Sequence, residues 1–273
     1  MKKQMSTVMA CLCVALLATS CKKDQAAKTP SANEISQDAL SAIYNKGFST
    51  ADVHKVSGGY LVEGDIFLSD ADLATAFTGP VLRVANTEQY RTTNLVTGLP
   101  RSIKIKVTGL GTAFIAGTDT AIARYNAQHL QLTFSRITSG TADITISGFN
   151  QGPSGGYITL GSSGFPTKAG KPYNSITLNT NTQAYGSNPN VLYVGSVIQH
   201  EMGHCIGFRH TDYFNRAYSC GGTATNEGAA GVGAILIPGT PSTADPNSFM
   251  LSCSNGGNRT FNANDIIALN YLY

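Results

Sequence analysis

The 273-residue sequence has no long hydrophobic run, no basic stripe and no internal repeat. The N-terminal apolar run, residues 8–18, is shorter than the roughly 20 residues that a transmembrane helix needs. The net charge of +3 is mild, and without a concentrated basic face we expect no nucleic-acid binding. A content of 42% hydrophobic and 13% charged residues is typical of a globular protein, and the length allows one domain, or one domain with a smaller appendage.

The first residues indicate export. Lys2 and Lys3 precede the apolar run, and small residues at 18–20 precede Cys21. This pattern resembles the lipobox of bacterial lipoproteins, which implies a signal peptide over residues 1–20, a lipid on Cys21 and a polar tether over residues 21–33. The protein is then an exported outer-membrane lipoprotein, periplasmic or on the cell surface, that meets the membrane through its lipid anchor only. An ordinary secretory signal, which gives a secreted protein, is the alternative.

Export also changes what the remaining cysteines indicate, because disulfides persist outside the cytoplasm. Cys205, Cys220 and Cys253 stay in the folded part, which allows one bridge and one leftover thiol. We favour a bridge between Cys220 and Cys253, which both lie in glycine-rich loop sequence, with Cys205 buried in a helix. Three free thiols are the alternative.

Hydrophobic periodicity predicts helices and strands without strict alternation, hence an α+β fold. In the N-terminal part we expect a helix over residues 34–45, a β-type segment over 59–68 and a capped helical turn over 69–73. A soft boundary follows between residues 78 and 92, where Thr78-Gly79-Pro80 breaks the pattern.

The remaining sequence predicts strands with few helices. Strands are expected over residues 102–107, 130–137, 142–146 and 175–179, and residues 151–173 form a long loop or a ragged edge strand. Helices are expected over residues 118–128, with Asp119 in the first turn, and from Pro189, capped by Asn188, to about residue 206. Residues 211–261 are mostly loop, and a capping box at Asn262 precedes a final helix.

One cluster carries chemistry. His200 and His204 are one turn apart on the predicted helix and can share a metal ion. Glu201 stands beside them and can act as a general base that takes a proton from water. Gly207 can adopt the left-handed conformation that ends a helix, which brings His210 round as a third ligand. Three histidines leave a coordination position open, as catalytic zinc requires.

This motif is specific because it extends beyond His-Glu-x-x-His to a glycine and a third histidine. A bare His-Glu-x-x-His occurs by chance in unrelated helices, so packed or exposed histidines are the alternative interpretation. The glycine and the third histidine at fixed offsets make coincidence much rarer. His54 and His129 lie outside the cluster and are expected to be structural or surface residues.

Residues 200–210 resemble the extended zinc signature of the metzincin metallopeptidases. Ser248-Phe249-Met250 fits the methionine turn of that superfamily, in which Met250 gives the metal site an apolar floor. The resemblance implies a metzincin-like catalytic domain over residues 91–273, with a twisted mixed sheet that ends in an edge strand, an active-site helix and a C-terminal helix. Within the superfamily, residues 201–212 and several downstream segments are most similar to the bacterial dual-action HEIGH metallopeptidases.

The sequence departs from some metzincins after Met250, where astacins and serralysins carry a tyrosine near the zinc. Help for the oxyanion comes either from Tyr213 or from the zinc alone, and the sequence leaves both open. The segment at residues 63–66 resembles the Gly-Asp-Ile core of astacin pro-segments. We therefore expect a pro-segment over residues 34–90 in which Asp65 caps the metal until cleavage near residues 86–92. Alternatively, Asp65 is only a turn residue after Gly64.

Together these features predict a monomeric zinc-dependent endopeptidase that acts on protein or peptide substrates, with Zn²⁺ on His200, His204 and His210 and with Glu201 as general base. An extended substrate would pair with an edge strand within residues 151–180. Two alternatives remain. One is a zinc-containing surface lipoprotein that binds ligands without proteolysis, and the other is a zinc hydrolase that acts on a non-peptide bond.

Overall fold

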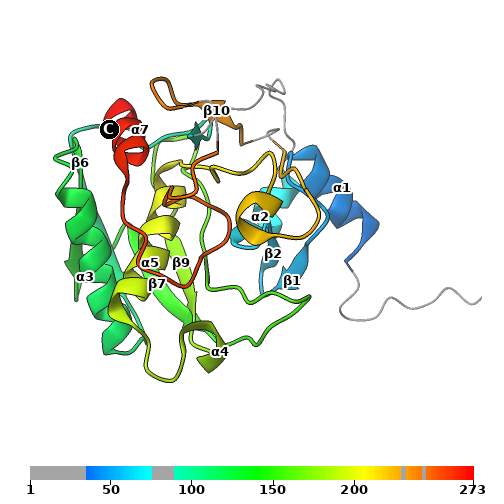
Figure 1. Cartoon of the computed structure of the whole chain (residues 1–273), viewed down its shortest axis with the longest axis horizontal. Coiled ribbons are helices and arrows are strands. Elements are labelled where there is room, and N and C mark those ends of the chain that lie inside the picture. The colour runs from blue at the N-terminus through cyan, green and yellow to red at the C-terminus, as the bar shows by residue number, and fades with distance from the viewer. Residues whose placement is uncertain (1–34, 76–88, 229–231, 242–243) are drawn as a thin grey trace, which may run out of the picture. The chain divides into compact units, whose positions relative to one another are not determined.

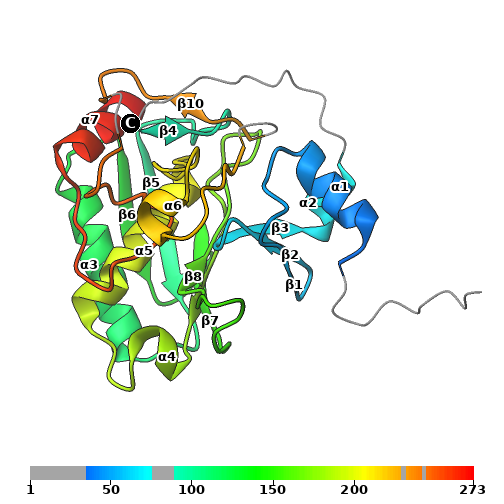
Figure 2. The same cartoon turned by 45° about the vertical axis from the view of Figure 1, so that its right-hand side comes forward.

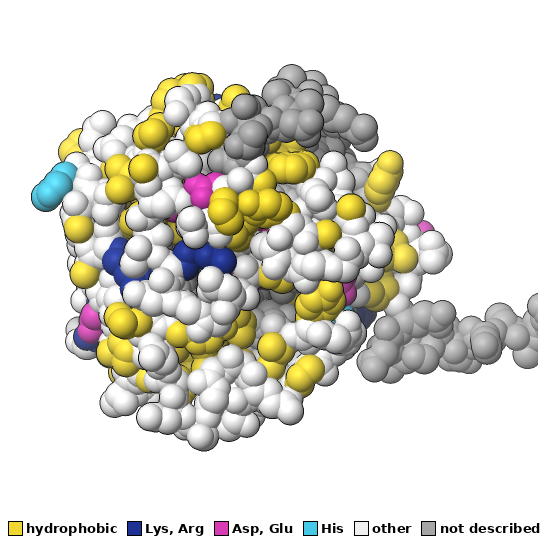
Figure 3. Space-filling model, in the orientation of Figure 1, with side chains coloured by type: hydrophobic (Ala, Val, Ile, Leu, Met, Phe, Trp, Pro, Cys, Tyr) yellow, Lys and Arg dark blue, Asp and Glu magenta, His cyan; other side chains and the backbone are white. Residues whose placement is uncertain are grey.

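The computed structural model describes residues 35–75, 89–228, 232–241 and 244–273. The signal peptide, Cys21 and the polar tether lie outside these residues, so export and lipid attachment stay predictions. No helix in the described ranges combines the length and the apolar character needed to cross a membrane. On the face drawn in Figure 3, charged side chains form small separate groups within an uncharged and hydrophobic surface.

The N-terminal part contains two helices and a small antiparallel sheet with strand order β1-β2-β3. Its elements are α1 (Gln37–Asn45), β1 (His54–Val56), β2 (Gly59–Val62), β3 (Ile66–Ser69) and α2 (Asp70–Ala74). The predicted continuous β segment over residues 59–68 is wrong, because the chain turns at Glu63 and Gly64, where φ is 56° and 90°. This part has its own apolar core, formed by Ile43, Phe48, Tyr60, Val62, Ile66 and Leu68.

A five-stranded mixed sheet forms the centre of the remaining chain, with strand order β6-β5-β7-β9-β8 (Figures 1 and 2). Four strands run parallel, and the short edge strand β8 runs antiparallel to β9. The strands are β5 (Arg101–Val107), β6 (Leu132–Ile137), β7 (Ile144–Phe149), β8 (Gly161–Ser162) and β9 (Ser175–Asn179). The α+β fold with a mixed sheet and an edge strand is therefore confirmed.

Two long helices, α3 (Thr112–Asn126) and α5 (Val191–Ile206), lie side by side (Figures 1 and 2). Glycines allow them to approach closely: a Cβ atom on Gly117 would lie 2.8 Å from the Val194 side chain. Residues 194–206 of α5 are all buried, so the helix carries its polar side chains in the protein interior. Such groups need partners there, because burying an unpaired polar group is costly.

Both helices begin at other residues than the sequence suggested. Helix α3 starts at Thr112, so Asp119 lies in its middle and pairs with Arg136 at 2.7 Å instead of facing the first turn. Helix α5 is capped by Asn190, whose side chain accepts hydrogen bonds from two backbone amides, and not by Asn188. Several turn-forming residues in succession offered competing caps, and the sequence pattern does not rank them.

The last third of the chain is more ordered than predicted. The stretch expected to be loop contains α6 (Ala217–Cys220) and β10 (Ile235–Leu236), which pairs with β4 (Tyr90–Arg91). A further short helix is α4 (Thr182–Tyr185). The final helix α7 (Ala263–Leu272) is confirmed, with Asn262 and Asp265 forming the expected capping box.

The cysteines are placed as the sequence analysis favoured. A disulfide joins Cys220, at the end of α6, to Cys253, in the loop after Met250. Cys205 is buried in α5 as a free thiol. The disulfide therefore links α6 to the chain that follows Met250.

Candidate active site

Three histidines are brought together by the end of α5. His200 and His204 lie one turn apart on the helix, which stops at Gly207, where φ is 113°. The amide of Gly207 donates to the carbonyl of Gly203, which closes the last helical turn. The left-handed glycine turns the chain back, and His210 then faces the other two rings.

Each imidazole is oriented by a hydrogen bond from its Nδ1 atom. Because a carbonyl or a carboxylate can only accept, these bonds place a proton on Nδ1 and leave the Nε2 lone pair free. The pairs are His200 to the Phe249 carbonyl at 2.9 Å, His204 to the Phe208 carbonyl at 2.9 Å, and His210 to the Glu227 carboxylate at 2.9 Å.

The free Nε2 atoms converge on one point. The Nε2 atom of His204 lies 3.0 Å from that of His200 and 3.2 Å from that of His210. Oδ2 of Asp65 lies 3.1 Å from the Nε2 atoms of both His200 and His210. In a tetrahedral zinc site with bonds of 2.0–2.1 Å, ligand atoms are about 3.3 Å apart. The four side chains therefore fit a tetrahedral metal ion.

The charges at the site stabilise a positive charge there: burial lowers the pKa of His210, but Asp65 and Glu227 outweigh it and raise that pKa well above its ordinary value. Burial, together with the neighbouring imidazoles, lowers the pKa of His204 to about 4, so this ring is neutral. Burial raises the pKa of Asp65, but the surrounding histidines outweigh it and hold that pKa well below its ordinary value. Oδ1 of Asp65 is buried and has no hydrogen-bond partner among the described residues. A buried carboxylate beside three lone pairs calls for a cation.

Glu201 faces the same cavity from the same helix. Its side chain is 2% exposed, and the Ser163 hydroxyl donates to Oε2 at 2.7 Å. Burial, and after it the negative charge of Asp65, raises the pKa of Glu201 well above its ordinary value. Gly161 leaves room for this carboxylate, since a Cβ there would lie 2.9 Å from Oε1. Glu201 is thus held as a proton acceptor beside the metal position.

Met250 lies fully buried in the turn beneath the histidines. Its carbonyl accepts a hydrogen bond from the Thr211 amide at 2.9 Å, which fixes the turn to the chain just after His210. Asp265 holds the same turn from α7 by accepting from the Phe249 amide at 3.1 Å. The turn thus supports the metal site through its backbone.

Gly203 should be hard to replace, because α5 touches this turn. A Cβ atom on Gly203 would lie 2.6 Å from the Met250 sulfur and 2.8 Å from the Phe249 ring. We expect Gly203→Ala to lower the free energy of unfolding by about 1–3 kcal/mol, the usual cost of overpacking. Gly111→Ala is the control, because nothing lies near a Cβ there. If both variants unfold at the same denaturant concentration as the parent, this close packing is wrong.

Arg209 connects the metal site to the N-terminal part. The side chain is fully buried, and its guanidinium lies 3.2 Å from Glu63 and 3.7 Å from Glu227. Burial raises the pKa of Glu63 to about 8, although Arg209 opposes this shift. Three rings surround the guanidinium at 5.6–6.0 Å from their centroids, namely those of Phe48, Phe165 and Tyr213.

Backbone hydrogen bonds attach the N-terminal part to the edge of the central sheet. The Ser163 amide donates to the Asp65 carbonyl at 3.0 Å, and the Phe67 amide donates to the Ser163 carbonyl at 2.8 Å. The Thr159 hydroxyl donates to the Gly64 carbonyl at 3.3 Å. Residues 64–67 therefore occupy the strand edge where a substrate was expected to pair.

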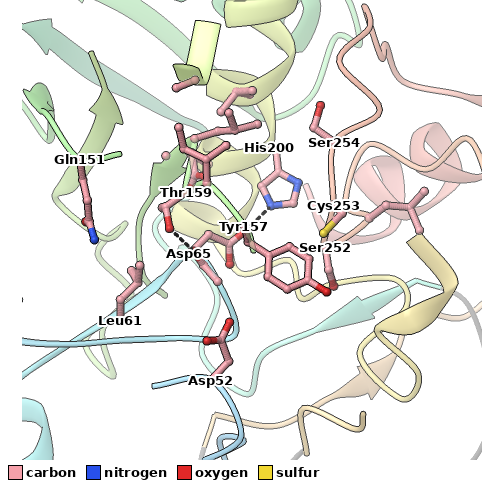
Figure 4. A pocket seen from close by; sticks show the side chains of 18 of the residues that line it. Asp52, Leu61, Asp65, Gln151, Tyr157, Thr159, His200, Ser252, Cys253 and Ser254 are labelled. Carbon is pink, nitrogen blue, oxygen red and sulfur yellow. Dashed lines mark hydrogen bonds and ion pairs between the residues drawn. The ribbon is translucent and has the colours of Figure 1, made fainter. Parts of the chain in front are cut away.

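A cavity of about 440 Å³ lies beside the site and is lined by Asp65, His200 and Glu201 among others. Figure 4 shows Asp65 reaching toward the ring of His200 within this cavity. Tyr213, one of the two candidates for oxyanion help, is not among the lining residues. It packs edge-on against the ring of Tyr90, with 4.5 Å between the centroids.

Sequence reasoning named the three histidines, Glu201, Met250 and Asp65, and the structure brings all six together. It missed Ser163, which holds Glu201, and Glu227, which holds His210. No motif marks either residue, since each comes from a separate loop or strand end and meets the site only in the folded chain.

A sequence profile of known proteins covers most of the chain. The profile of the dual-action HEIGH metallopeptidases matches residues 61–273. The chain belongs to this family. It is thus a metallopeptidase, and the match spans the histidine cluster, the methionine turn and the segment that carries Asp65.

The solved structures to which this metallopeptidase is similar include two that are remote in sequence. Among curated proteins, none matches its sequence. A solved structure of myroilysin is 15% identical, with a TM-score of 0.42 over 66% of this chain and 96% of that chain. High choriolytic enzyme 1, a hatching enzyme zinc-protease from Oryzias latipes (medaka fish), is 17% identical, with a TM-score of 0.37 over 63% of this chain and 88% of that chain.

Proposed function

We propose that the protein is a zinc-dependent endopeptidase that is made as a latent precursor. The observation that carries the proposal is the convergence of three histidine Nε2 lone pairs and the buried carboxylate of Asp65 on one point. Beside them lies the carboxylate of Glu201, which is bound by Ser163 instead. A zinc ion in this position supplies a Lewis acid that lowers the pKa of water to about 7 and polarises a peptide carbonyl.

The chain's own residues then have defined tasks. Glu201, held by Ser163, accepts a proton from the attacking water and passes it to the departing amine. Glu227 and the carbonyls of Phe208 and Phe249 keep the histidine rings in the orientation that ligation needs. The edge strand that now binds residues 64–67 offers the same backbone groups to a substrate.

We propose that the N-terminal part keeps the enzyme latent. Asp65 takes a ligand position at the metal, and its backbone neighbours fill the substrate edge. Cleavage was expected near residues 86–92, of which 86–88 lie outside the described residues. Gln89, Tyr90 and Thr92 are at most 1% exposed, and the side-chain amide of Gln89 donates to the Asp265 carboxylate at 2.6 Å. This burial favours cleavage before Gln89, since proteases cut exposed chain.

The test is proteolysis by the full-length protein after limited digestion has cut it ahead of Gln89. We expect casein cleavage that a zinc chelator abolishes and that added Zn²⁺ restores, because the proposed mechanism needs the metal to activate water. Metal analysis before and after chelation gives the zinc content per chain. A cut protein that binds one zinc ion but leaves casein intact would contradict the endopeptidase proposal, and would favour the binding protein or the non-peptide hydrolase instead.

A further inference from the structure

The side chain of Arg216 has no assigned task. It lies just before α6, is half-buried, and makes no hydrogen bond or ion pair within the described ranges. It lines the active-site cavity together with His200 and Glu201, and also a second cavity of about 310 Å³ with Asp52 and Glu63. A guanidinium has five donors, and a partly desolvated one without an acceptor is positioned to bind an anion.

Arg216 lies against Gly64, the residue that precedes Asp65 at the metal position. A Cβ atom on Gly64 would collide with the Arg216 guanidinium, so the two groups are in contact. The following residue, Asp65, has its carboxylate among the histidines. In this arrangement, the residue beside the one at the metal position therefore lies against Arg216.

No carboxylate of the described residues forms an ion pair with Arg216, although its charge contributes to lowering the pKa of Glu227. Asp52 belongs to the N-terminal part and is paired with His54 at 2.9 Å. Glu227 is 1% exposed and is already bound to His210 and Arg209. After removal of the N-terminal part, the remaining residues that line the active-site cavity include one carboxylate, Glu201, and two guanidinium groups, those of Arg216 and Arg259.

The position of Arg216 is also well defined. Its backbone amide donates to the Thr225 carbonyl at 2.9 Å, and its own carbonyl accepts from the Cys220 amide at 3.1 Å. Cys220 is in turn joined to Cys253, which lines the active-site cavity and is labelled in Figure 4. The backbone that carries this cation is therefore fixed beside the cavity.

We propose that Arg216 determines specificity, selecting substrates that carry an acidic side chain on a residue next to the scissile bond. This inference rests on the proposed endopeptidase function and adds a substrate class to it. The acidic side chain would make a charge-assisted hydrogen bond with the guanidinium in the place where Gly64 now lies. An uncharged amide of the same shape would bind less well.

The experiment compares peptide pairs that differ only by Asp against Asn on either side of the cleaved bond. Using full-length protein activated by limited digestion, we expect kcat/KM to be about 10–100-fold higher for the acidic peptide, the effect of one charged hydrogen bond. Arg216→Gln should remove most of this preference by lowering kcat/KM for the Asp peptide far more than for the Asn peptide. Arg136→Gln is the matched control, because Arg136 pairs with Asp119 and does not line the cleft.

Equal rates on both peptides, or an equal loss on both in Arg216→Gln, would overturn the inference. A binding measurement separates it from the proposed function. The same peptides, labelled with a fluorophore, are titrated into the activated Glu201→Gln protein and into its Arg216→Gln double variant. Acid-dependent binding that disappears with Arg216 supports the inference even if no peptide is ever cleaved, in which case only the endopeptidase proposal fails. Acid-independent binding overturns the inference even if peptides are cleaved.

Discussion

Glu201→Gln should lower the kcat/KM of the activated protein about 10²–10⁴-fold, the usual contribution of a general base. Glutamine keeps the shape of the side chain and can still accept a hydrogen bond from Ser163, which lies 2.7 Å from Oε2. It cannot accept a proton at neutral pH. The measurement is the rate on a quenched fluorescent peptide, with the zinc content determined on the same sample.

The zinc content shows whether a lower rate of the Glu201→Gln variant reflects loss of the base or loss of the metal. Glu201 makes no contact with the histidine Nε2 atoms, so Glu201→Gln should bind as much zinc as the parent. Asp119→Asn is a control for loss of a carboxylate, since Asp119 is exposed on α3 and should leave the rate nearly unchanged. If Glu201→Gln with a full complement of zinc stays within tenfold of the parent, Glu201 is not the base.

Asp65→Ala should make the uncut full-length protein active. Asp65 contacts the Nε2 atoms of His200 and His210 at 3.1 Å, and its removal opens one ligand position. We expect the uncut variant to cleave a short peptide about 10–100-fold faster than the uncut parent, the effect of losing one charged contact. Backbone bonds to Ser163 still hold residues 65–67 at the sheet edge, so the uncut variant should remain slower than the cut enzyme.

Asp52→Ala provides the matched control for this result. Asp52 lies in the same N-terminal part and lines the same cavity, but it pairs with His54 and not with the metal ligands. It should leave latency intact, and all three proteins should reach equal rates once the N-terminal part has been removed. An Asp65→Ala chain that is as latent as the Asp52→Ala chain would show that Asp65 is only a turn residue.

The metal site could be predicted from sequence because its ligands are close together in the chain. His200, His204 and His210 are fixed by one helical turn and by one left-handed glycine, and both follow from local physical rules. The final helix and its capping box were predictable for the same reason.

Interactions between distant residues could not be predicted in this way. Ser163 and Glu201 are separated by 38 positions, and His210 and Glu227 by 17. Asp65 is 135 positions from His200 and was found only through a resemblance of its segment to known pro-segments. Helix starts failed where neighbouring turn-forming residues compete as caps, as at Asn188 and Asn190, because tertiary packing decides among them.

Ser163 binds both the chain at the sheet edge and the proposed base, Glu201. Its backbone amide and carbonyl bind Asp65 and Phe67 at the sheet edge, while its hydroxyl holds Glu201. The alignment of the base is therefore mechanically linked to the occupancy of the edge. In the proposed mechanism, a peptide paired along the edge would steady the proton acceptor, whereas one that touches only the metal position would not. We therefore expect the rate of cleavage to depend on pairing along the edge as well as on contact with the metal position.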